Sequence, residues 1–517
     1  FNDISKYLLF RKCLFVLFCL FTILCKKAFF MQKRGEIKMR EKFKNSLILD
    51  ILPIIFIIVF GEISILQWRT GVVPPILAGV VVSGAIAFMR GETLRNIEDA
   101  MGSGVKRVFP ALLTVILVGL IVSSWIIGGI IPSMVYWGFK VIDFRFFVPI
   151  VMAMTGVVAI ITGTSFTSIG TIGVSFIIIA KQVGIPLEIT AGAIVSGAFL
   201  GDKMSPLSDT TNISAALGKT DLFEHIQYML MDTIPAFIIA IIGFTIVGNN
   251  ITVENINLDN INGFLTEMET VFNVTPILLL VPLVVIILGI KKIPSNIVLF
   301  SSVIMGVLSS FIFQNFKTVD IMRSTILGVN QKFNDPSVTK LFARGGMNEV
   351  SGTVIIIIFI GCLIGIINEC HSFDNLLNKI QSGIKSSRQL TVAVFLVSLG
   401  VGFVTGAQLL AIILPISIFL PLFEKFNLKN KNITRIVEAT GTVGITLVPW
   451  SVPGIFIAGT LGVDMIKVVP YLFFPIALLV VNLFFNVTEI GTSKLENENG
   501  EKRKIKKGSI VFNLFSK

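Results

Sequence analysis

The chain has 517 residues, of which 54% are hydrophobic and 14% are charged, and its mean hydropathy is +0.87. Soluble domains have roughly 45–50% apolar and about 25% charged residues, so the composition excludes an ordinary soluble protein and indicates a polytopic membrane protein. The net charge of +12 does not predict nucleic-acid binding, because the basic residues gather in two short segments, 31–44 and 502–508, beside apolar runs. Such clusters are typical of cytoplasmic membrane edges, where they also attract anionic lipid.

The first 38 residues contain a short apolar core, from Cys13 to Cys25, and precede a second candidate start at Met39. This core is short for a membrane span, so we expect a signal-like or dispensable segment. The five cysteines have neither metal-ligand spacing nor the pattern of a disulfide framework. We expect both termini to be cytoplasmic and the protein to be a multi-pass protein of the cell membrane, of the bacterial inner-membrane type.

Apolar runs long enough to cross a bilayer, about 17–25 residues each, recur along nearly the whole chain and predict about ten to twelve transmembrane helices. The linker 249–274 contains acidic residues but no Lys or Arg, which favours the extracytoplasmic side. The predicted organisation is an N-terminal extension and basic segment (1–46), a first transmembrane repeat (47–248), this linker, a second repeat (275–486) and a basic cytoplasmic tail (487–517).

An internal repeat relates the two halves. The segment TGTSFTSIG begins at Thr162 and TGAQLLAII begins at Thr405, 243 residues later (405 − 162 = 243), and Pro206 and Pro449 have the same separation. Each half interrupts its apolar sequence twice with Gly, Pro or hydroxyl residues, and unpaired backbone is tolerated in a bilayer only where protein or water covers it. Corresponding interruptions in two halves indicate a transporter site near the membrane midplane. The charges of the linkers place them on opposite sides, so we expect the repeats to be inverted.

The polar stretch GDKMSPLSDTTNIS, residues 201–214, directly follows the apolar run ITAGAIVSGAFL. Asp202 and Asp209 lie two helical turns apart, but Pro206 disfavours a continuous helix between them. A break frees backbone carbonyls, which together with carboxylate and hydroxyl oxygens form a site suited to a small hard cation. The neutral side-chain oxygens available there are those of Ser205, Ser208, Thr210, Thr211 and Asn212.

A buried carboxyl group favours its protonated form, and a bound cation favours the carboxylate. One site can therefore hold either a proton or a cation, which is the minimum requirement for cation/proton exchange and needs no cofactor. Two structural alternatives are an ion pair of Lys203 with Asp202 or Asp209 that holds a bend, and an exposed loop. In either case we expect Lys203 to be a structural or modulatory partner.

Glu438, in RIVEATGTVG, is the other acid beside a predicted helix break. It is either a modulatory residue of the ion site or a membrane-edge partner of Arg435, three residues earlier. No phosphate-binding glycine loop, hydrolytic triad or zinc cluster occurs in the sequence, so we expect no enzyme.

The stretch GDKMSPLSDTTN resembles the signature of the NhaC family of sodium/proton antiporters. SSWIIGGIIPSM (123–134), LFARGGM (341–347), VPWSVPG (448–454) and FIAGTLGV (456–463) are similar to other landmarks of that family, in the same order. The resemblance covers about residues 47–485. It implies an all-α secondary carrier with two inverted repeats, re-entrant hairpins and broken helices. The further site residues that it implies are, at the hairpin tips and in the second unwound segment, Thr162, Thr164, Ser165, Thr405, Gln408 and Ser451.

We therefore predict a secondary active antiporter in which sodium ions and protons compete for Asp202 and Asp209 by alternating access, within the lipid bilayer and without nucleic acid. A sodium- or proton-coupled exchanger of small organic acids such as malate and lactate is the main alternative, and a cation channel is another. Ala439 and Val452 stand where the family often has polar residues, so the second half-site is expected to be less polar, which leaves the substrate open. The oligomeric state also stays open, with a homodimer as one option.

Overall fold

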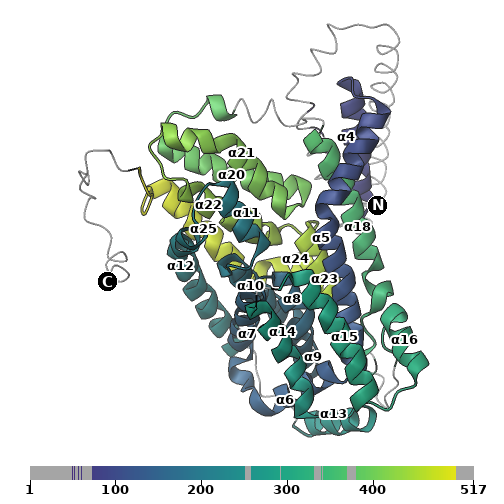
Figure 1. Ribbon diagram of the computed structural model, residues 1–517. Helices are drawn as coiled ribbons and strands as arrows, with labels where there is room; N and C mark the ends of the chain where they lie inside the picture. Colours follow the sequence, from purple (N-terminus) through teal and green to yellow (C-terminus); the bar gives the residue numbers. More distant parts are fainter. Residues whose placement is uncertain are drawn as a thin grey trace, which may run out of the picture. The chain divides into compact units, whose positions relative to one another are not determined.

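The computed structural model describes residues 73–250, 258–291, 293–330, 342–369 and 380–495, with isolated positions at 49, 52, 56, 60, 64 and 339 (Figure 1). The predicted N-terminal extension and most of the basic tail lie outside these residues. The expectation that both termini are cytoplasmic therefore also concerns residues outside the described part. Every regular element in the described part is a helix, and one isolated bridge joins Leu428 to Lys494. The predicted all-helical fold class is therefore confirmed.

The first part of the chain contains α4 (Val73–Met89), α5 (Leu94–Ile127), α6 (Ile130–Val141), η2 (Phe144–Phe146), α7 (Phe147–Thr162), α8 (Ser165–Ser168), η3 (Ile169–Gly173), α9 (Val174–Val183), α10 (Leu187–Met204), α11 (Asp209–Leu217), α12 (Leu222–Asn249) and α13 (Leu258–Val271). The second part contains η5 (Pro276–Leu279), α14 (Leu280–Ile290), α15 (Ser295–Phe313), α16 (Thr318–Leu327), α18 (Gly346–Glu369), α20 (Ser387–Thr405), α21 (Gln408–Lys425), α22 (Lys431–Val437), η6 (Glu438–Val443), η7 (Gly444–Leu447), α23 (Val452–Leu461), α24 (Met465–Val468), η8 (Val469–Tyr471) and α25 (Phe473–Thr488).

Eight helices in the described ranges are long and apolar enough to cross a membrane, or up to eleven if each bent pair of helices forms one span. One bent pair, Lys431–Leu447 with Val452–Leu461, turns by 46° at the break between Leu447 and Val452, which includes Ser451. Broken helices are therefore present, as the interrupted apolar runs predicted. The protein is a multi-pass membrane protein, and the inversion of its two halves stays a prediction.

Contacts divide the chain into two units, residues 1–109 with 355–383 and residues 110–354 with 384–517. In the first unit, α4 packs through Ala87 on Ile97 of α5 and Ile366 of α18, within one buried apolar cluster. The first parts of α5 and the last parts of α18 also meet at glycines, since a Cβ on Gly104 would lie 2.1 Å from the carbonyl oxygen of Gly361. The second unit contains all the candidate site residues.

Within the second unit, the backbones of α7 and α10 are in direct contact. A Cβ added to Gly197 would lie 2.0 Å from the carbonyl oxygen of Met152, and one added to Gly201 would lie 2.3 Å from that of Gly156. Small residues allow membrane helices to approach this closely. The contact places the end of α10, which contains Asp202, beside the end of α7, where the chain turns into α8.

The two halves end their hairpin helices in the same way. Gly163 ends α7 with φ +71°, and Gly406 ends α20 with φ +65°, a left-handed conformation that favours glycine. The hydroxyl groups of the residues before them, Thr162 and Thr405, donate to the carbonyl oxygens four residues earlier, at 2.9 and 2.7 Å. The sequence repeat is therefore also a repeat of local structure.

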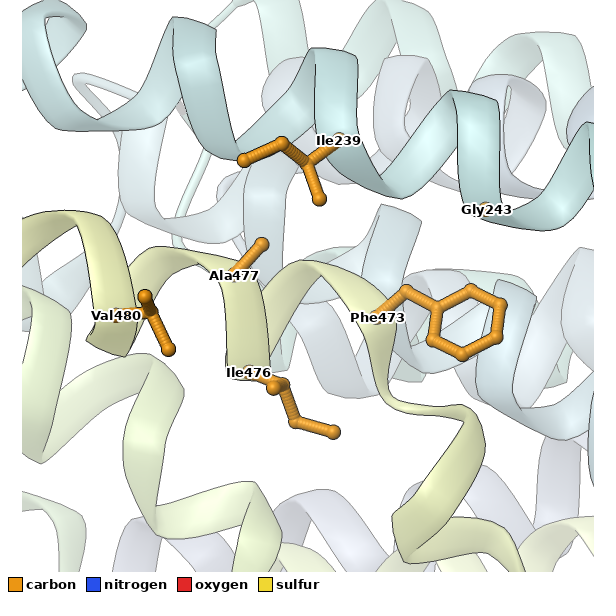
Figure 2. A pocket seen from close by; sticks show the side chains of 6 residues that line it. All are labelled: Ile239, Gly243, Phe473, Ile476, Ala477 and Val480. Atoms are coloured by element: carbon orange, nitrogen blue, oxygen red, sulfur yellow. The ribbon is translucent and has the colours of Figure 1, made fainter.

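An apolar hollow of about 270 Å³ lies between α12 and α25, which run side by side (Figures 1 and 2). Its lining residues are Ile239, Gly243, Phe473, Ile476, Ala477 and Val480. Because none of these side chains offers a hydrogen-bonding or charged group, the hollow does not suit an ion. Three of the lining side chains, Ile239, Ile476 and Val480, are exposed on the outer surface of the two helices.

Candidate functional site

At the first hairpin tip the chain changes direction at Gly163. A side chain at this position would collide with Leu207. A Cβ at this position would lie 2.6 Å from Cβ of Leu207. The chain then passes through Thr164, which has an extended backbone, into α8, and α8 continues through the π-helix η3 into α9. Each limb of the hairpin is 19 residues long, Phe144–Thr162 and Ser165–Val183. Limbs of this length suffice to cross a bilayer, so re-entry of the hairpin stays a prediction.

The carboxylate of Asp202 lies at this hairpin tip. Its Oδ2 accepts hydrogen bonds from the Ser165 hydroxyl at 2.7 Å and from the Ser165 backbone N–H at 3.2 Å. Its Oδ1 accepts a hydrogen bond from the Ser208 hydroxyl at 2.6 Å, and the Ser208 and Thr210 hydroxyl groups lie 3.0 Å apart. Asp202 is 6% exposed. The structure thus brings together four residues that the sequence predicted for the site.

The break between α10 and α11 supplies further oxygen atoms. The chain leaves the helix at Ser205, whose hydroxyl donates to the carbonyl oxygen of Ile160 in α7 at 2.6 Å. The Thr211 hydroxyl donates to the carbonyl oxygen of Lys203 at 3.2 Å, and the Asn212 amide donates to that of Ser208 at 2.8 Å. The first two of these bonds satisfy carbonyl groups that the end of a helix leaves without partners, whereas the carbonyl of Ser208, the N-cap of α11, also accepts from the Asn212 backbone N–H.

Lys203, next to Asp202 in the chain, points to a different acid. Its Nζ donates to Oδ1 of Asp232 and to the Thr233 hydroxyl, both at 2.9 Å, and both charged side chains are fully buried. The amide of Asn482 donates to the other oxygen of Asp232 at 2.6 Å. The two predicted ion-pair alternatives, with Asp202 or Asp209, are therefore replaced by a pair with Asp232. Among the described residues the carboxylate of Asp202 makes no ion pair.

Asp232 was not identified as a candidate from the sequence. It lies in MLMDTIPAF, inside the apolar run of α12, and an acid within a membrane span was the available signal. Asn482 of α25 also contributes, and its own amide oxygen accepts from Asn486 at 2.8 Å. Arg435 donates to Asn486 at 3.2 Å, which extends a buried polar chain from Lys203 to α22.

Asp209 differs from the expectation that both acids are buried. It is the first residue of α11, and its side chain is exposed. The cause is the direction of α11, which turns its second residue, Thr210, toward Ser208 and thereby turns Asp209 outward. Whether Asp209 contacts the ion stays a prediction.

Glu438 is fully buried and lies at the start of the π-helix η6. Its Oε1 accepts a hydrogen bond from the Ser214 hydroxyl of α11 at 2.6 Å. The predicted alternative of a pair with Arg435 is not found, because the Arg435 guanidinium points to Asn486 and stacks over Tyr228. Glu438 is thus held against the segment that follows the break after Asp202.

The predicted residues of the second half bond to backbone carbonyl groups rather than to a carboxylate. Gln408, at the second hairpin tip, donates to the carbonyl oxygen of Thr442 at 3.1 Å. Ser451 caps α23 and donates to the carbonyl oxygen of Val448 at 2.7 Å. The position that corresponds to Asp202 after 243 residues is occupied by Ile445. The residues of the second half that match the first thus surround no carboxylate of their own.

The sequence profile of the Na+/H+ antiporter family matches residues 43–211 and 197–487, which include both hairpins and both helix breaks. The chain belongs to the Na+/H+ antiporter family. The Na+/H+ antiporter NhaC of Bacillus subtilis is 33% identical over 401 residues, which are 77% of this chain and 88% of that protein. The resemblance to the NhaC family is therefore confirmed.

The alignments with two other relatives include a larger share of this chain. The NhaC antiporter of Alkalihalophilus pseudofirmus is 33% identical over 431 residues, 81% of this chain and 92% of that protein. The malate-2H+/Na+-lactate antiporter of Bacillus subtilis is 29% identical over 447 residues, 84% of this chain and 95% of that protein. All three relatives named here are antiporters, which agrees with the expectation that the chain is a transporter rather than an enzyme.

Proposed function

We propose that this chain exchanges sodium ions for protons at Asp202 by alternating access. One observation carries the proposal: Asp202 is a buried carboxylate whose contacts in the described part are all neutral donors, while Lys203 beside it is paired with Asp232. An unpaired charge in a protein interior is costly. The carboxylate therefore needs a proton or a cation, and the two compete for the same oxygen atoms.

The hydroxyl groups around Asp202 suit both occupants. A serine hydroxyl rotates and has one donor and two acceptor lone pairs. Ser165 and Ser208 can donate to the bare carboxylate, as they do in this structure, or turn their oxygen atoms toward a bound cation. Thr210, beside Ser208, remains within hydrogen-bonding reach of it in either arrangement. Hard cations such as sodium favour such oxygen ligands over nitrogen or sulfur.

The remaining predicted residues take supporting roles in this proposal. Asp209 attracts cations from water to the break, since its carboxylate is exposed at the start of α11. The second hairpin tip, with Thr405 and Gln408, and the second break, with Ser451, complete the site from the other half. The inverted relation of the halves then lets the site open to one side of the membrane at a time.

The test is transport by the purified protein in liposomes that contain a pH-sensitive dye. An imposed sodium gradient should drive proton movement in the opposite direction, and Asp202→Asn should abolish it. Asp464→Asn is the matched control: Asp464 is an exposed cap of α24 whose oxygen accepts from Ile466 N–H, and asparagine caps a helix equally well. Exchange at the normal rate by Asp202→Asn would refute the assignment of Asp202.

Exchange of organic acids is a second candidate, favoured by the similarity to the malate-2H+/Na+-lactate antiporter. The same liposomes separate the two functions when malate or lactate is added inside or outside. A pH change that requires an organic acid would favour this candidate, and a pH change with sodium alone favours sodium/proton exchange. Ion flux without counterflow, at rates far above those of a carrier, would indicate a channel instead.

A further inference from the structure

We propose that Glu438 is a second proton-binding site, and that its ionisation strengthens the binding of sodium at Asp202. The inference rests on the proposed exchange at Asp202 and goes beyond it by assigning the residue through which pH sets sodium affinity. It starts from an atom without a partner. Oε1 of Glu438 accepts from Ser214, but Oε2 has no hydrogen-bond partner in the described part of the chain.

A hydroxyl group stands opposite this free oxygen atom. The Thr442 side chain lies on the same π-helix and faces the Glu438 carboxylate. Nevertheless neither Oγ1 of Thr442 nor Oε2 of Glu438 makes a hydrogen bond of ordinary geometry among the described residues, and both residues are fully buried. A proton on Oε2 would satisfy both atoms at once, with the carboxylic acid donating to the threonine. π-helical turns of this kind are frequent at functional sites.

The charged groups near Glu438 come from α10 and α22. Asp202 and Lys203 of α10 are within electrostatic range of its carboxylate. Lys203 is already bound to Asp232, and Arg435, on the preceding turn, is bound to Asn486. Glu438 therefore has no fixed cation of its own in the described structure, so it is held as an acid or as an unpaired carboxylate.

Of the other helices that pack on η6, α11 carries one titratable group, Asp209, which is exposed at its first residue, five residues before Ser214. α20 contacts η6 through Ser398, α21 contacts it through Gln408 and Ala411, and α25 contains no ionisable residue. The ionisable residues of α20 and α21, which are Arg388, Glu424 and Lys425, lie at the far ends of those helices. Asp202 is thus the buried acid with which Glu438 can interact, while the other nearby acid, Asp209, is exposed.

Two routes connect the two acids. The first is electrostatic: ionised Glu438 adds a negative charge within range of the cation at Asp202, and by linkage a bound cation disfavours the proton on Glu438. The second route is mechanical and runs through α11. This helix contains Ser214, which donates to Glu438, and it begins directly after Ser208, which donates to Asp202. Sodium at Asp202 and a proton at Glu438 therefore oppose each other.

The test compares the KM for sodium across pH in liposomes for the wild type, Glu438→Gln and Glu438→Asp. Coupling between two sites typically changes affinity about 5–150-fold. Glu438→Gln should raise the KM by a factor in this range at alkaline pH, where the wild-type residue is ionised, and should change it little at acid pH. Glu438→Asp keeps a carboxyl group and should keep the pH dependence of the wild type.

An increase in KM by the same factor at every pH, or no increase at all, would overturn the inference, since a merely structural role has no preferred pH. If Glu438→Gln fails to fold, as judged by gel filtration, Thr442→Val provides the second test. It removes the hydroxyl to which the protonated acid donates without changing charge, and should therefore shift the alkaline transition in KM to lower pH. An unshifted transition would also overturn the inference. Failure of the Asp202→Asn experiment, in contrast, would remove the proposed exchange itself.

Discussion

The buried pair of Lys203 and Asp232 allows a quantitative prediction. Asp232→Asn keeps the size of the side chain but removes its charge, so that Lys203 is left as a buried cation beside Thr233 and two amides. Both charged side chains are 0% exposed, and the Nζ to Oδ1 distance is 2.9 Å. Because Lys203 is fully buried, bulk solvent does not screen the remaining charge, and the acids Asp202 and Glu438 accept hydrogen bonds from hydroxyl groups.

The expected cost is large because removing one partner of a buried ion pair destabilises proteins by about 3–5 kcal/mol. This corresponds to a decrease of roughly two to four orders of magnitude in the ratio of folded to unfolded protein. Replacing both residues by apolar ones of similar size, Lys203→Met with Asp232→Leu, should recover most of this loss, because buried pairs are often no more stable than well-packed apolar residues.

The assay is titration with a denaturing detergent in mixed micelles, followed by circular dichroism. Glu224→Gln is the matched control: the pair of Lys431 and Glu224 is equally short, 2.8 Å, but its side chains are 18% and 49% exposed. An exposed pair contributes about 0–1 kcal/mol, and screening by solvent lowers this further. The reasoning is refuted if Asp232→Asn costs no more than Glu224→Gln.

Gly197→Ala should cost about 1–3 kcal/mol or more, because its Cβ would lie 2.0 Å from a carbonyl oxygen of α7, whereas Gly400→Ala meets nothing within 4 Å and should change little. Thermal melts compare the two, and equal melting temperatures would contradict the close contact. Ser208→Ala should raise the KM for sodium several-fold more than Ser451→Ala, since Ser208 contacts a carboxylate and Ser451 contacts backbone carbonyls; equal effects in sodium-driven transport would argue against Asp202 as the site. Gly406→Ala, at φ +65°, should cost about 1–2 kcal/mol and lower transport, and an unchanged melting temperature would count against the left-handed turn.

Sequence patterns were sufficient for the all-helical class and for the local structure of the first half-site. The apolar runs predicted the spans, and Pro206 predicted the break that separates α10 from α11. The clustering of Asp202 with Ser208 follows from their closeness in the chain. Ser165, 37 residues before Asp202, entered only through the resemblance to a family.

The contacts between distant helices could not be predicted. The partner of Lys203 is 29 residues away on α12, and nothing in the periodicity of an almost wholly apolar helix shows which face packs on α10. The exposure of Asp209 could not be predicted for a similar reason, because it depends on the direction in which α11 leaves the break. Glu438 and Ser214 are 224 residues apart and meet only because the two halves fold onto each other.

The glycine contact between α7 and α10 limits how a transport cycle can proceed. With the two backbones touching at Gly197 and Gly201, neither helix can slide or rotate past the other without a collision of main-chain atoms. Under the proposed exchange, Ser165, which follows α7, and Asp202, which ends α10, should therefore move together as one rigid body. We therefore expect substitutions that slow turnover without changing sodium affinity to lie on other surfaces of this body.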